Sequence, residues 1–354
     1  MSQKRKGIVV LLVGGLLLWW FISRIDTAAV GQHLREVKLW PLVLASVLIN
    51  LTLVFRSLRW QILLGPVVAV PFRPLLAATS VGFGSIFVIG RVGEIIRPAV
   101  LSLQERLRPS LTVASIFVER LFDTTAIVLL FSLNLVFFSL PAETPARIAQ
   151  VAAMRTLGAV LTLGVFLGIG VLLLLRWRSV WVRTLLLERL YPLAPRLMRP
   201  VINFVHHLTD SLGVLTNLRA LTLTTISTGL VWGTGMVASW LISFAFDVPL
   251  SLQELIFLLG FGMVGSVVPT PGGSAGAFHA AAAAGLEFLG LEANLAASMA
   301  IVYHLIAFGP PFLMALYFLI RDDLSLRQLR EALASEQSSE PPAHPSSVQG
   351  GPPQ

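Results

Sequence analysis

The sequence predicts an all-α membrane protein that crosses the bilayer several times. Of its 354 residues, 55% are hydrophobic and 12% are charged, and the mean hydropathy is +0.81. Soluble domains carry about 25% charged residues. A helix needs about 20 apolar residues to cross a bilayer. Stretches near or above that length lie at 7–23, 40–62, 112–140, 156–176, 221–246 and 294–320.

The composition excludes several classes of function. The chain contains no cysteine, which excludes disulfides, thiolate metal sites and cysteine nucleophiles. Its net charge of +8 comes from Lys and Arg residues that lie mostly beside apolar stretches. That is the pattern of cytoplasmic loops rather than of a nucleic-acid surface. An ATP-binding GxxxxGK loop does not occur. We therefore expect no nucleic-acid partner, no cofactor, no metal and no direct drive by ATP.

The two ends of the chain differ from its apolar centre. Residues 1–6 are basic and precede an apolar run that lacks a small-residue cleavage site, so we predict a retained first span rather than a signal peptide. Residues 1–325 are predicted to form one transmembrane domain. Residues 326–354 would be a cytoplasmic tail, disordered from about residue 336, where Ser, Pro and Gly dominate.

The distribution of basic residues predicts the orientation. Cytoplasmic loops carry an excess of Lys and Arg, whereas the loops PAETPAR and FDVPLSLQE are poor in arginine and carry acids. Both termini are thereby assigned to the cytoplasm, and the chain to the plasma (inner) membrane. The segment 24–38 has mixed charge and fits less well. The residues assigned to cytoplasmic segments are Lys4, Arg5, Lys6, Arg56, Arg59, Arg73, Arg176, Arg178, Arg183, Arg189, Arg196, Arg199, Arg321, Arg327 and Arg330.

Two further apolar segments, 75–103 and 251–290, do not fit simple spans. Each has an apolar arm, then a break that is charged or rich in Gly and Pro, then a second short arm. If each were one span, Arg106 and Arg108 would lie outside the cell, whereas a re-entrant hairpin keeps them in the cytoplasm. Irregular backbone at membrane depth must be buried in protein or line a polar cavity. We therefore predict two re-entrant helical hairpins, and about eight membrane segments in all.

The order of these elements is the same in the two halves of the chain. Residues 1–145 and 150–325 each contain span, span, hairpin and span, so the halves are predicted to be inverted repeats. Hairpin one would enter from the cytoplasm and hairpin two from outside. Interrupted helices at matching places in inverted halves indicate a transporter's midplane site. Between the halves, 180–219 has helical apolar spacing, which we interpret as an interfacial structural helix rather than a lipid sensor.

Charged residues gather in hairpin one and in the span that follows it. In GRVGEIIRP, Gly90 and Gly93 permit a turn, Pro98 marks a kink or a new helix, and Arg91, Glu94 and Arg97 share one broad helical face. In VERLFD, the candidate residues are Glu119, Arg120 and Asp123. Asp123 lies about 16 Å along its span from residue 112, near the middle of the bilayer.

These six charges have two interpretations. They can neutralise one another and hold the hairpin in place, as paired buried charges do. Alternatively, some pairs form while arginine binds a lipid phosphate or another anion, because ionisable residues inside membranes are usually functional and guanidinium suits phosphate.

Hairpin two carries the sequence PTPGGSAGAFHAA. Its prolines end the first arm, and Gly272 and Gly273 precede a new helix that should begin near Ser274. Free N–H groups and the helix dipole at such a start favour an anion, although close packing alone would also explain the glycines.

The ordered combination of GRVGEIIRP, VERLFD and PTPGG resembles the flippase-like membrane domain of the lysylphosphatidylglycerol synthase superfamily. RSLRW at the end of the second span is also similar to that family, and the resemblance covers about residues 5–325. It implies a lipid-translocating domain, often fused to a cytoplasmic aminoacyl-transferase domain. No such domain follows the last span here, so we do not expect this chain to synthesise lysyl-lipid.

Two positions depart from the family pattern. His279 stands where the family usually has glutamate, and His304 stands where it usually has arginine. We predict that the two imidazoles face each other in place of an ion pair. A histidine pair that shares one proton is neutral or +1 near pH 7, so proton coupling is one interpretation and a pair of core histidines is the other. A metal site is a weaker one, since no third ligand is evident.

The leading functional hypothesis is a lipid flippase or transporter rather than an enzyme. The predicted substrate-binding residues are Arg91, Glu94, Arg97, Glu119, Arg120, Asp123, Gly272, Gly273, His279 and His304. Arginines would bind the phosphate, while the acids would position them or bind a cationic headgroup. The alternatives are an intramembrane transferase with Asp123 or Glu119 as base, and a non-catalytic partner of a lipid, glycosyl or cell-envelope enzyme. A homo-oligomer is compatible with each hypothesis.

Overall fold

The computed structural model describes residues 16, 19–23, 25–137, 145–177, 213–214, 217–267 and 271–322. Within these ranges the chain is helical and contains no strand. The predicted tail lies outside the described residues, as do most of the predicted first span and most of the segment 180–219.

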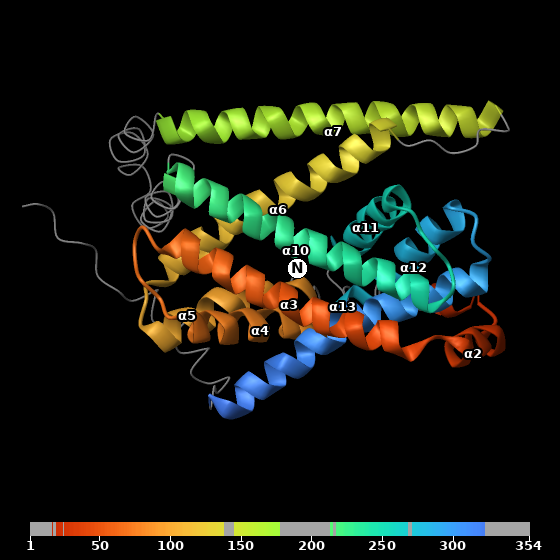
Figure 1. Ribbon diagram of the computed structural model, residues 1–354, viewed down its shortest axis with the longest axis horizontal. Helices are drawn as coiled ribbons and strands as arrows, with labels where there is room; N and C mark the ends of the chain where they lie inside the picture. The colour runs from red at the N-terminus through yellow and green to blue at the C-terminus, as the bar shows by residue number, and fades with distance from the viewer. Residues whose placement is uncertain are drawn as a thin grey trace, which may run out of the picture.

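Long helices form the body of the molecule (Figure 1). Among the described residues, five apolar stretches are long enough to cross a membrane: Leu39–Leu64, Phe72–Ile89, Val151–Val171, Leu218–Ala245 and Ala293–Arg321. This establishes an all-α, multi-pass membrane protein. The longer helices with their bounds are α3 (Leu39–Leu64), α6 (Pro109–Phe137), α7 (Pro145–Trp177), α10 (Leu218–Ala245) and α13 (Ala293–Arg321), and a short helix, α2 (Thr27–Glu36), precedes α3.

The count of spans differs in detail from the prediction. Phe72–Ile89 is long and apolar enough to cross a membrane by itself, although we predicted it as one arm of a hairpin. In contrast, α6 is not among the five candidate spans, although it was predicted as a full crossing. It carries Glu119, Arg120 and Asp123 near its middle.

Both segments predicted as hairpins fold as pairs of packed helices. The first comprises α4 (Phe72–Ile89), the 3₁₀ turn η1 (Gly90–Ile95) and α5 (Ile96–Glu105). The second comprises α11 (Leu252–Val267) and α12 (Pro271–Phe288). In Figure 1, α4 and α5 lie in the left half and α11 and α12 in the right half. α12 also packs against α4 and η1, so the two hairpins contact each other.

Glycines set the shape of hairpin one. Gly90 ends α4 with φ of 68°, a left-handed conformation that glycine adopts without steric cost. A Cβ on Gly93 would lie 2.7 Å from the backbone nitrogen of Ile86, and a Cβ on Gly82 would lie 2.5 Å from Cβ of Arg97. Both distances are too short for real atoms, so α5 approaches α4 this closely only because these residues lack side chains.

The C-terminal helix α13 joins the two hairpins. It packs against α4, α12 and α3, and it contains Pro310 and Pro311 in its interior. A Cβ on Gly84 of α4 would lie 2.9 Å from the carbonyl oxygen of Pro311. α4 therefore crosses α13 in contact with its proline segment.

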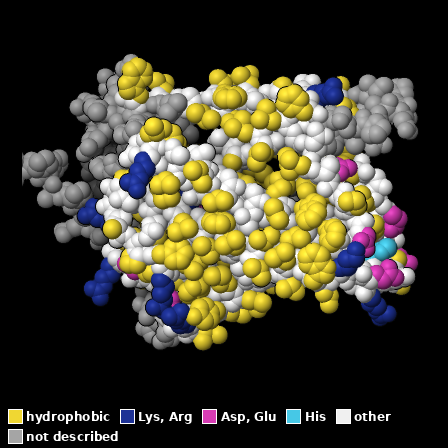
Figure 2. All heavy atoms as spheres, in the orientation of Figure 1, with side chains coloured by type: hydrophobic (Ala, Val, Ile, Leu, Met, Phe, Trp, Pro, Cys, Tyr) yellow, Lys and Arg dark blue, Asp and Glu magenta, His cyan; other side chains and the backbone are white. Residues whose placement is uncertain are grey.

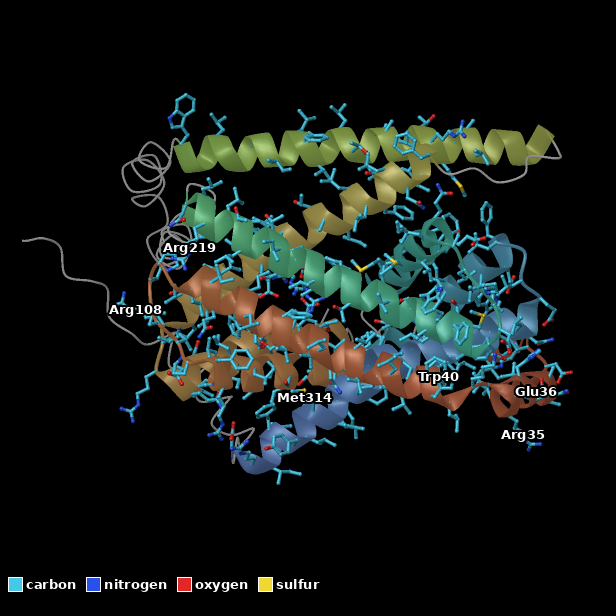
Figure 3. All side chains as sticks on the ribbon, in the orientation of Figure 1. Arg35, Glu36, Trp40, Arg108, Arg219 and Met314 are labelled. Atoms are coloured by element: carbon cyan, nitrogen blue, oxygen red, sulfur yellow. The ribbon has the colours of Figure 1, made fainter. Side chains whose placement is uncertain are left out.

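Apolar and charged side chains separate on the surface. Figure 2 shows hydrophobic side chains over the middle of the visible face, with most Lys, Arg, Asp and Glu towards its two ends. Figure 3 places Arg108 and Arg219 at one end of the long axis and Arg35 and Glu36 at the other. An apolar belt between two charged ends is the surface that a membrane-spanning protein requires.

Candidate functional site

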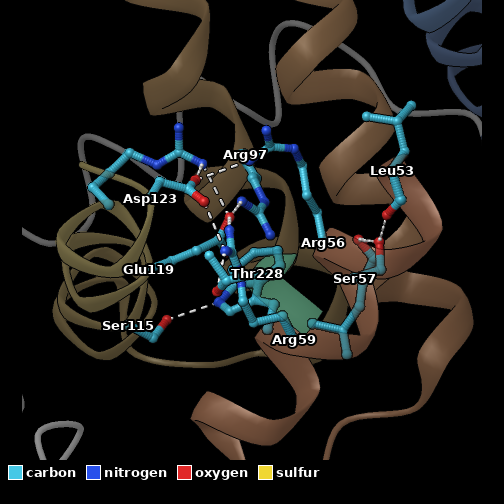
Figure 4. Close-up of polar contacts among 12 residues, drawn as sticks. Leu53, Arg56, Ser57, Arg59, Arg97, Ser115, Glu119, Asp123 and Thr228 are labelled. Carbon is cyan, nitrogen blue, oxygen red and sulfur yellow. Dashed lines mark hydrogen bonds and ion pairs between the residues drawn. The ribbon is translucent and has the colours of Figure 1, made fainter. Parts of the chain in front are cut away.

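Six charged residues from three helices meet inside the molecule. We call them the arginine cluster: Arg56 and Arg59 of α3, Arg97 of α5, and Glu119, Arg120 and Asp123 of α6. Figure 4 shows Arg56, Arg59, Arg97, Glu119 and Asp123 converging. The cluster thus links hairpin one to the helices on both sides of it in the sequence.

Glu119 is the centre of this arrangement. Its Oε1 accepts hydrogen bonds from Arg97 at 2.8 Å, from Arg59 at 3.0 Å and from Arg120 at 3.0 Å. Its Oε2 is buried and has no hydrogen-bond partner among the described residues. One carboxylate oxygen therefore serves three guanidinium groups.

Asp123, one turn further along α6, accepts from both of its oxygens. Its Oδ1 accepts from Arg59 at 2.7 Å, and its Oδ2 lies 2.9 Å from Arg56 and 3.0 Å from Arg120. Arg59 also donates to the hydroxyl of Thr228 on α10 at 2.9 Å. Arg120 and Asp123, three residues apart on α6, are therefore paired, and α10 contributes a polar contact that we did not predict.

The cluster is closed on one side and partly open on the other. The side chains of Arg59 and Glu119 are 0% exposed, whereas those of Arg56 and Arg120 are 12% and 30% exposed. Access from outside the protein is therefore on the side of Arg56 and Arg120.

Several donors in the cluster are buried without an acceptor. They are Nε of Arg59, Nε and Nη2 of Arg97, and Nε of Arg120, none of which has a hydrogen-bond partner in the described parts of the chain. Buried guanidinium donors without partners are costly, and they are the groups that bind phosphate or carboxylate oxygens most strongly.

A small cavity adjoins these donors. It has a volume of about 10 Å³ and is lined by Gly82, Phe83, Glu94, Arg97, Ile116 and Arg120. A cavity of about 10–15 Å³ holds one water molecule. In this conformation the cavity therefore accommodates water but not a phosphate group.

Aromatic rings complete the walls of the site. The guanidinium of Arg97 lies 4.2 Å from the centre of the Trp60 ring, and the Trp60 Nε1 donates to the hydroxyl of Ser115 at 2.8 Å. The Phe83 ring of α4 lies 4.8 Å from the guanidinium of Arg56. It also lies 5.8 Å from that of Arg97 and 5.7 Å from that of Arg120. Phe83 therefore offers its π-face to cations from three helices.

The structure brings together four of the six charges predicted to converge at hairpin one: Arg97, Glu119, Arg120 and Asp123. Glu94 lines the adjoining cavity. Arg91 belongs to η1, but its side chain lies outside the described part of the chain.

Arg56 and Arg59 were predicted as cytoplasmic charges that end the second span. The structure places both inside α3, where they bind the carboxylates of α6. The available signal was their spacing in RSLRW, which puts two arginines one turn apart inside an otherwise apolar helix.

The start of α12 has an unusual backbone. Gly272, Gly273 and Ser274 have φ values of 72°, 64° and 62°, so three consecutive residues are left-handed. Regular right-handed helix follows, in agreement with the predicted start near Ser274. A left-handed conformation costs a non-glycine residue about 1–2 kcal/mol, so Ser274 is strained.

The two histidines that depart from the family pattern meet beside this turn. The ring centres of His279 on α12 and His304 on α13 are 4.7 Å apart, with the planes at 70°. The Nε2 of His304 lies 3.3 Å from the carbonyl oxygen of Gly273. The predicted contact between the two imidazoles is therefore present, and we call these residues the histidine pair.

The histidine pair lies in an aromatic environment and has no third ligand. His279 is 9% exposed and His304 3%, and the rings nearest to them belong to Phe21, Phe87, Phe278 and Phe308. Within the described residues, no group of three or more His, Cys, Asp or Glu is arranged to hold a metal ion.

Comparisons with known proteins identify the family of this chain. Neither the comparison with curated proteins nor that with solved structures gives a match. The sequence does match the family described as the lysylphosphatidylglycerol synthase TM region, over residues 7–315. This match includes both hairpins, the arginine cluster and the histidine pair. Because it extends over most of the chain, the protein belongs to the lysylphosphatidylglycerol synthase TM-region family.

Proposed function

We propose that this protein moves a phospholipid, or another lipid with an anionic headgroup, across the bilayer, with the arginine cluster as the phosphate site. The observation that carries this proposal is the set of buried arginine donors without acceptors, together with the excess of arginine over carboxylate. Family membership supports a role connected with membrane lipids.

The charges of the cluster favour an anion. Four guanidinium groups surround the carboxylates of Glu119 and Asp123, and Glu94 lies beside the cavity. Positive charge therefore exceeds negative charge even when Glu94 is included. Because both central carboxylates are already held by arginines, the cluster suits a phosphate better than a cationic headgroup.

The arrangement of the hairpins supports a path across the membrane. In this proposal α4–η1–α5 and α11–α12 are re-entrant hairpins that enter from opposite faces and meet through α12, α4 and η1. The end with Arg108 and Arg219 would be cytoplasmic, as would both termini, in the plasma membrane. The headgroup would pass between the hairpins, where polar backbone is buried in protein.

Translocation requires a second conformation. The cavity of about 10 Å³ is too small for a phosphate group, so α4 and α5 would have to move away from α6. The phosphate would then bind Arg97 and Arg120, which are held to Glu119 in the closed state.

The test uses purified protein in liposomes that contain fluorescent phospholipid. We expect the Arg97→Gln and Arg120→Gln variants to lose most of the wild-type lipid movement, since each removes a phosphate donor while keeping a polar side chain. Arg108→Gln, at an exposed arginine outside the cluster, is the matched control and should behave as wild type. Correctly folded Arg97→Gln and Arg120→Gln proteins that move lipid at the wild-type rate would show that the phosphate site is elsewhere.

One observation favours a second candidate function. The carboxylates in the cluster are held by arginines of their own chain, which fits a structural role and a non-catalytic partner of a lipid or cell-envelope enzyme. If the wild-type protein moves no lipid of any headgroup, this second function is the one to pursue. Because these carboxylates are already paired with arginines, they fit the role of counter-ions better than the role of the catalytic base that a transferase needs.

A further inference from the structure

The histidine pair is a polar site that the phosphate-binding proposal does not use. Both ring nitrogens of His279 are buried and have no hydrogen-bond partner among the described residues. A neutral imidazole has one donor and one acceptor, so the site leaves both unsatisfied, which destabilises this arrangement. The Nε2 of His304 lies 3.3 Å from the carbonyl oxygen of Gly273, and the backbone of Gly272 is also within hydrogen-bond reach of this imidazole. The unsatisfied ring of His279 makes the pair unfavourable as a purely structural contact.

A proton on the pair would be still more costly in this conformation. The Phe21 ring lies 5.2 Å from the His279 ring, and a cation over such a ring is attracted only weakly. An unpaired buried charge is disfavoured more strongly. The cost of the charge therefore exceeds the aromatic contribution, and the closed pair is neutral.

The other ionisable groups on the surrounding elements do not offset that charge. Tyr303 of α13 donates its hydroxyl to the carbonyl of Ser239, and Glu287 of α12 is exposed. Arg73 of α4 binds Asp322, and Asp26, which follows the segment of Phe21, caps α2. Arg321 of α13 donates to Tyr317, Glu94 of η1 lines the arginine cavity, and the side chain of Arg91 in η1 is outside the described residues. Glu254 of α11 accepts from the backbone N–H of Ser251, and Glu292 caps the N-terminus of α13.

α4 connects the histidine pair to the arginine cluster. Phe83 contacts the guanidinium groups of Arg56, Arg97 and Arg120, and the Phe87 ring lies 6.1 Å from that of His304. Residues four apart lie on one face of a helix, about 6 Å apart along its axis. A movement of α4 that opens the cluster therefore also disturbs the packing around His304.

We propose that the histidine pair is a proton-binding site: it is neutral while α12 packs against α13, and it binds one proton when the two helices separate. Water then reaches the imidazoles, which take up a proton near neutral pH when hydrated. Since the open state binds more protons than the closed state, acid favours opening. The proton is the ligand, and through Phe83 and Phe87 its binding is coupled to the arginine cluster.

The first test measures opening without lipid transport. The natural chain has no cysteine, so a single Ser274→Cys substitution reports on the turn beside His304, where Ser274 is 1% exposed. Its rate of labelling by a maleimide is divided by that of Ala28→Cys, an exposed position on α2, which corrects for the pH dependence of thiol chemistry. We expect this ratio to rise as the pH is lowered from about 8 to about 5.5. For one proton, the rise is at most about tenfold per pH unit.

Three backgrounds assign the proton. In His279→Gln/His304→Gln, and in His279→Glu/His304→Arg, which installs the charge pair usual in the family, the ratio should be independent of pH. Two such backgrounds guard against one that does not fold. In Glu287→Gln, at an exposed acid of α12, the wild-type slope should remain. A flat ratio with both histidines present, or an unchanged slope without them, overturns the proposal, as does loss of the slope in Glu287→Gln, which would assign the proton to that carboxylate.

The second test concerns coupling and rests on the proposed lipid movement. In liposomes with fluorescent phospholipid, the rate of lipid movement by the wild-type protein should rise as the pH is lowered over the same range as for the labelling ratio. In His279→Gln/His304→Gln the rate of lipid movement should be independent of pH. Lipid movement that is independent of pH would disprove the coupling between the histidine pair and the arginine cluster. The labelling experiment would still decide whether the histidine pair binds the proton. Absence of movement at every pH would reject the proposed function, and the labelling result would still stand.

Discussion

The two hairpins solve the problem of burying polar groups in opposite ways. Hairpin one contributes Arg97 to a cluster of full charges, in which guanidinium groups of α3, α5 and α6 surround the carboxylates of α6. Hairpin two contributes His279, which meets His304 in an aromatic environment without any carboxylate in hydrogen-bond contact. The first site is always ionised and is held by strong pairs. The second is neutral in this conformation and, in our proposal, takes up a proton when water reaches it.

This difference separates two tasks within one fold. A permanently charged site suits an anionic ligand, since its donors do not depend on pH. A site with two imidazoles suits a ligand that is itself a proton. Substitutions in the two regions test this division.

Removing the central carboxylate should give the largest loss of stability. In Glu119→Gln, three arginines lose their shared charged acceptor, and breaking a buried ion pair from one side costs about 3–5 kcal/mol. Thermal unfolding in detergent should detect the loss. Glu287→Gln, at an exposed acid of α12, is the matched control. Equal stability of the two variants would mean that the cluster does not hold hairpin one.

Close packing of hairpin one should give the next effect. In Gly82→Ala the new Cβ would lie 2.5 Å from Cβ of Arg97, and such overpacking costs about 1–3 kcal/mol. On α10, Gly233 has no atom within 4 Å of the corresponding position. Gly233→Ala should therefore be neutral or stabilising by up to about 1 kcal/mol. A pair of variants with the same unfolding midpoint would contradict the close contact of α4 with α5.

The turn of hairpin two should respond with the opposite sign. Ser274 is left-handed, with φ of 62°, so Ser274→Gly should stabilise the protein by about 1 kcal/mol. Ser274→Val should destabilise it, because a β-branched side chain fits this conformation poorly. Both are measured by the same thermal unfolding. If the valine variant were the more stable one, the left-handed turn would be absent in solution.

The N-terminus of α13, the helix of His304, should give the smallest effect. Glu292 accepts from the backbone N–H groups of Asn294 and Leu295, and these hydrogen bonds lower the pKa of its carboxyl. Glu292→Ala should cost about 0.5 kcal/mol, the low end for a helix cap. The greater stability of the wild type over Glu292→Ala should be fully present above the ordinary carboxyl pKa of about 4.3. This difference in stability should disappear as the pH falls through the lowered folded-state pKa. A difference that grew in acid would contradict this assignment.

Most of the architecture could be predicted from apolar length and from helix breakers. The interruptions at GRVGEI and PGGS coincide with η1 and with the left-handed turn of α12. The predicted spans 40–62, 221–246 and 294–320 lie within a few residues of α3, α10 and α13. α7 begins at Pro145, well before the predicted 156, because Arg155 can extend to the membrane surface and does not end a helix.

The members of the site were only partly predictable. Glu119 and Asp123 attracted attention because acids are rare in apolar spans, whereas Arg56 and Arg59 near a helix end looked like ordinary cytoplasmic charges. Their role depends on α3 lying beside α6, which no local pattern reveals. The contact between His279 and His304 was anticipated only from the resemblance to the family, which implies an acid and a base at these positions and hence that they face each other.

The paired prolines of α13 also determine how this helix can move. Neither Pro310 nor Pro311 has a backbone N–H, so the carbonyls of Ile306 and Ala307 lack the usual helical donor. At this point α13 is held by fewer hydrogen bonds than elsewhere along its length, and Gly84 of α4 packs directly against it. α13 therefore consists of two regular helical segments joined by a hinge at the prolines. The segment that carries His304 can tilt with hairpin two while the segment that ends at Arg321 stays beside Arg73 and Asp322.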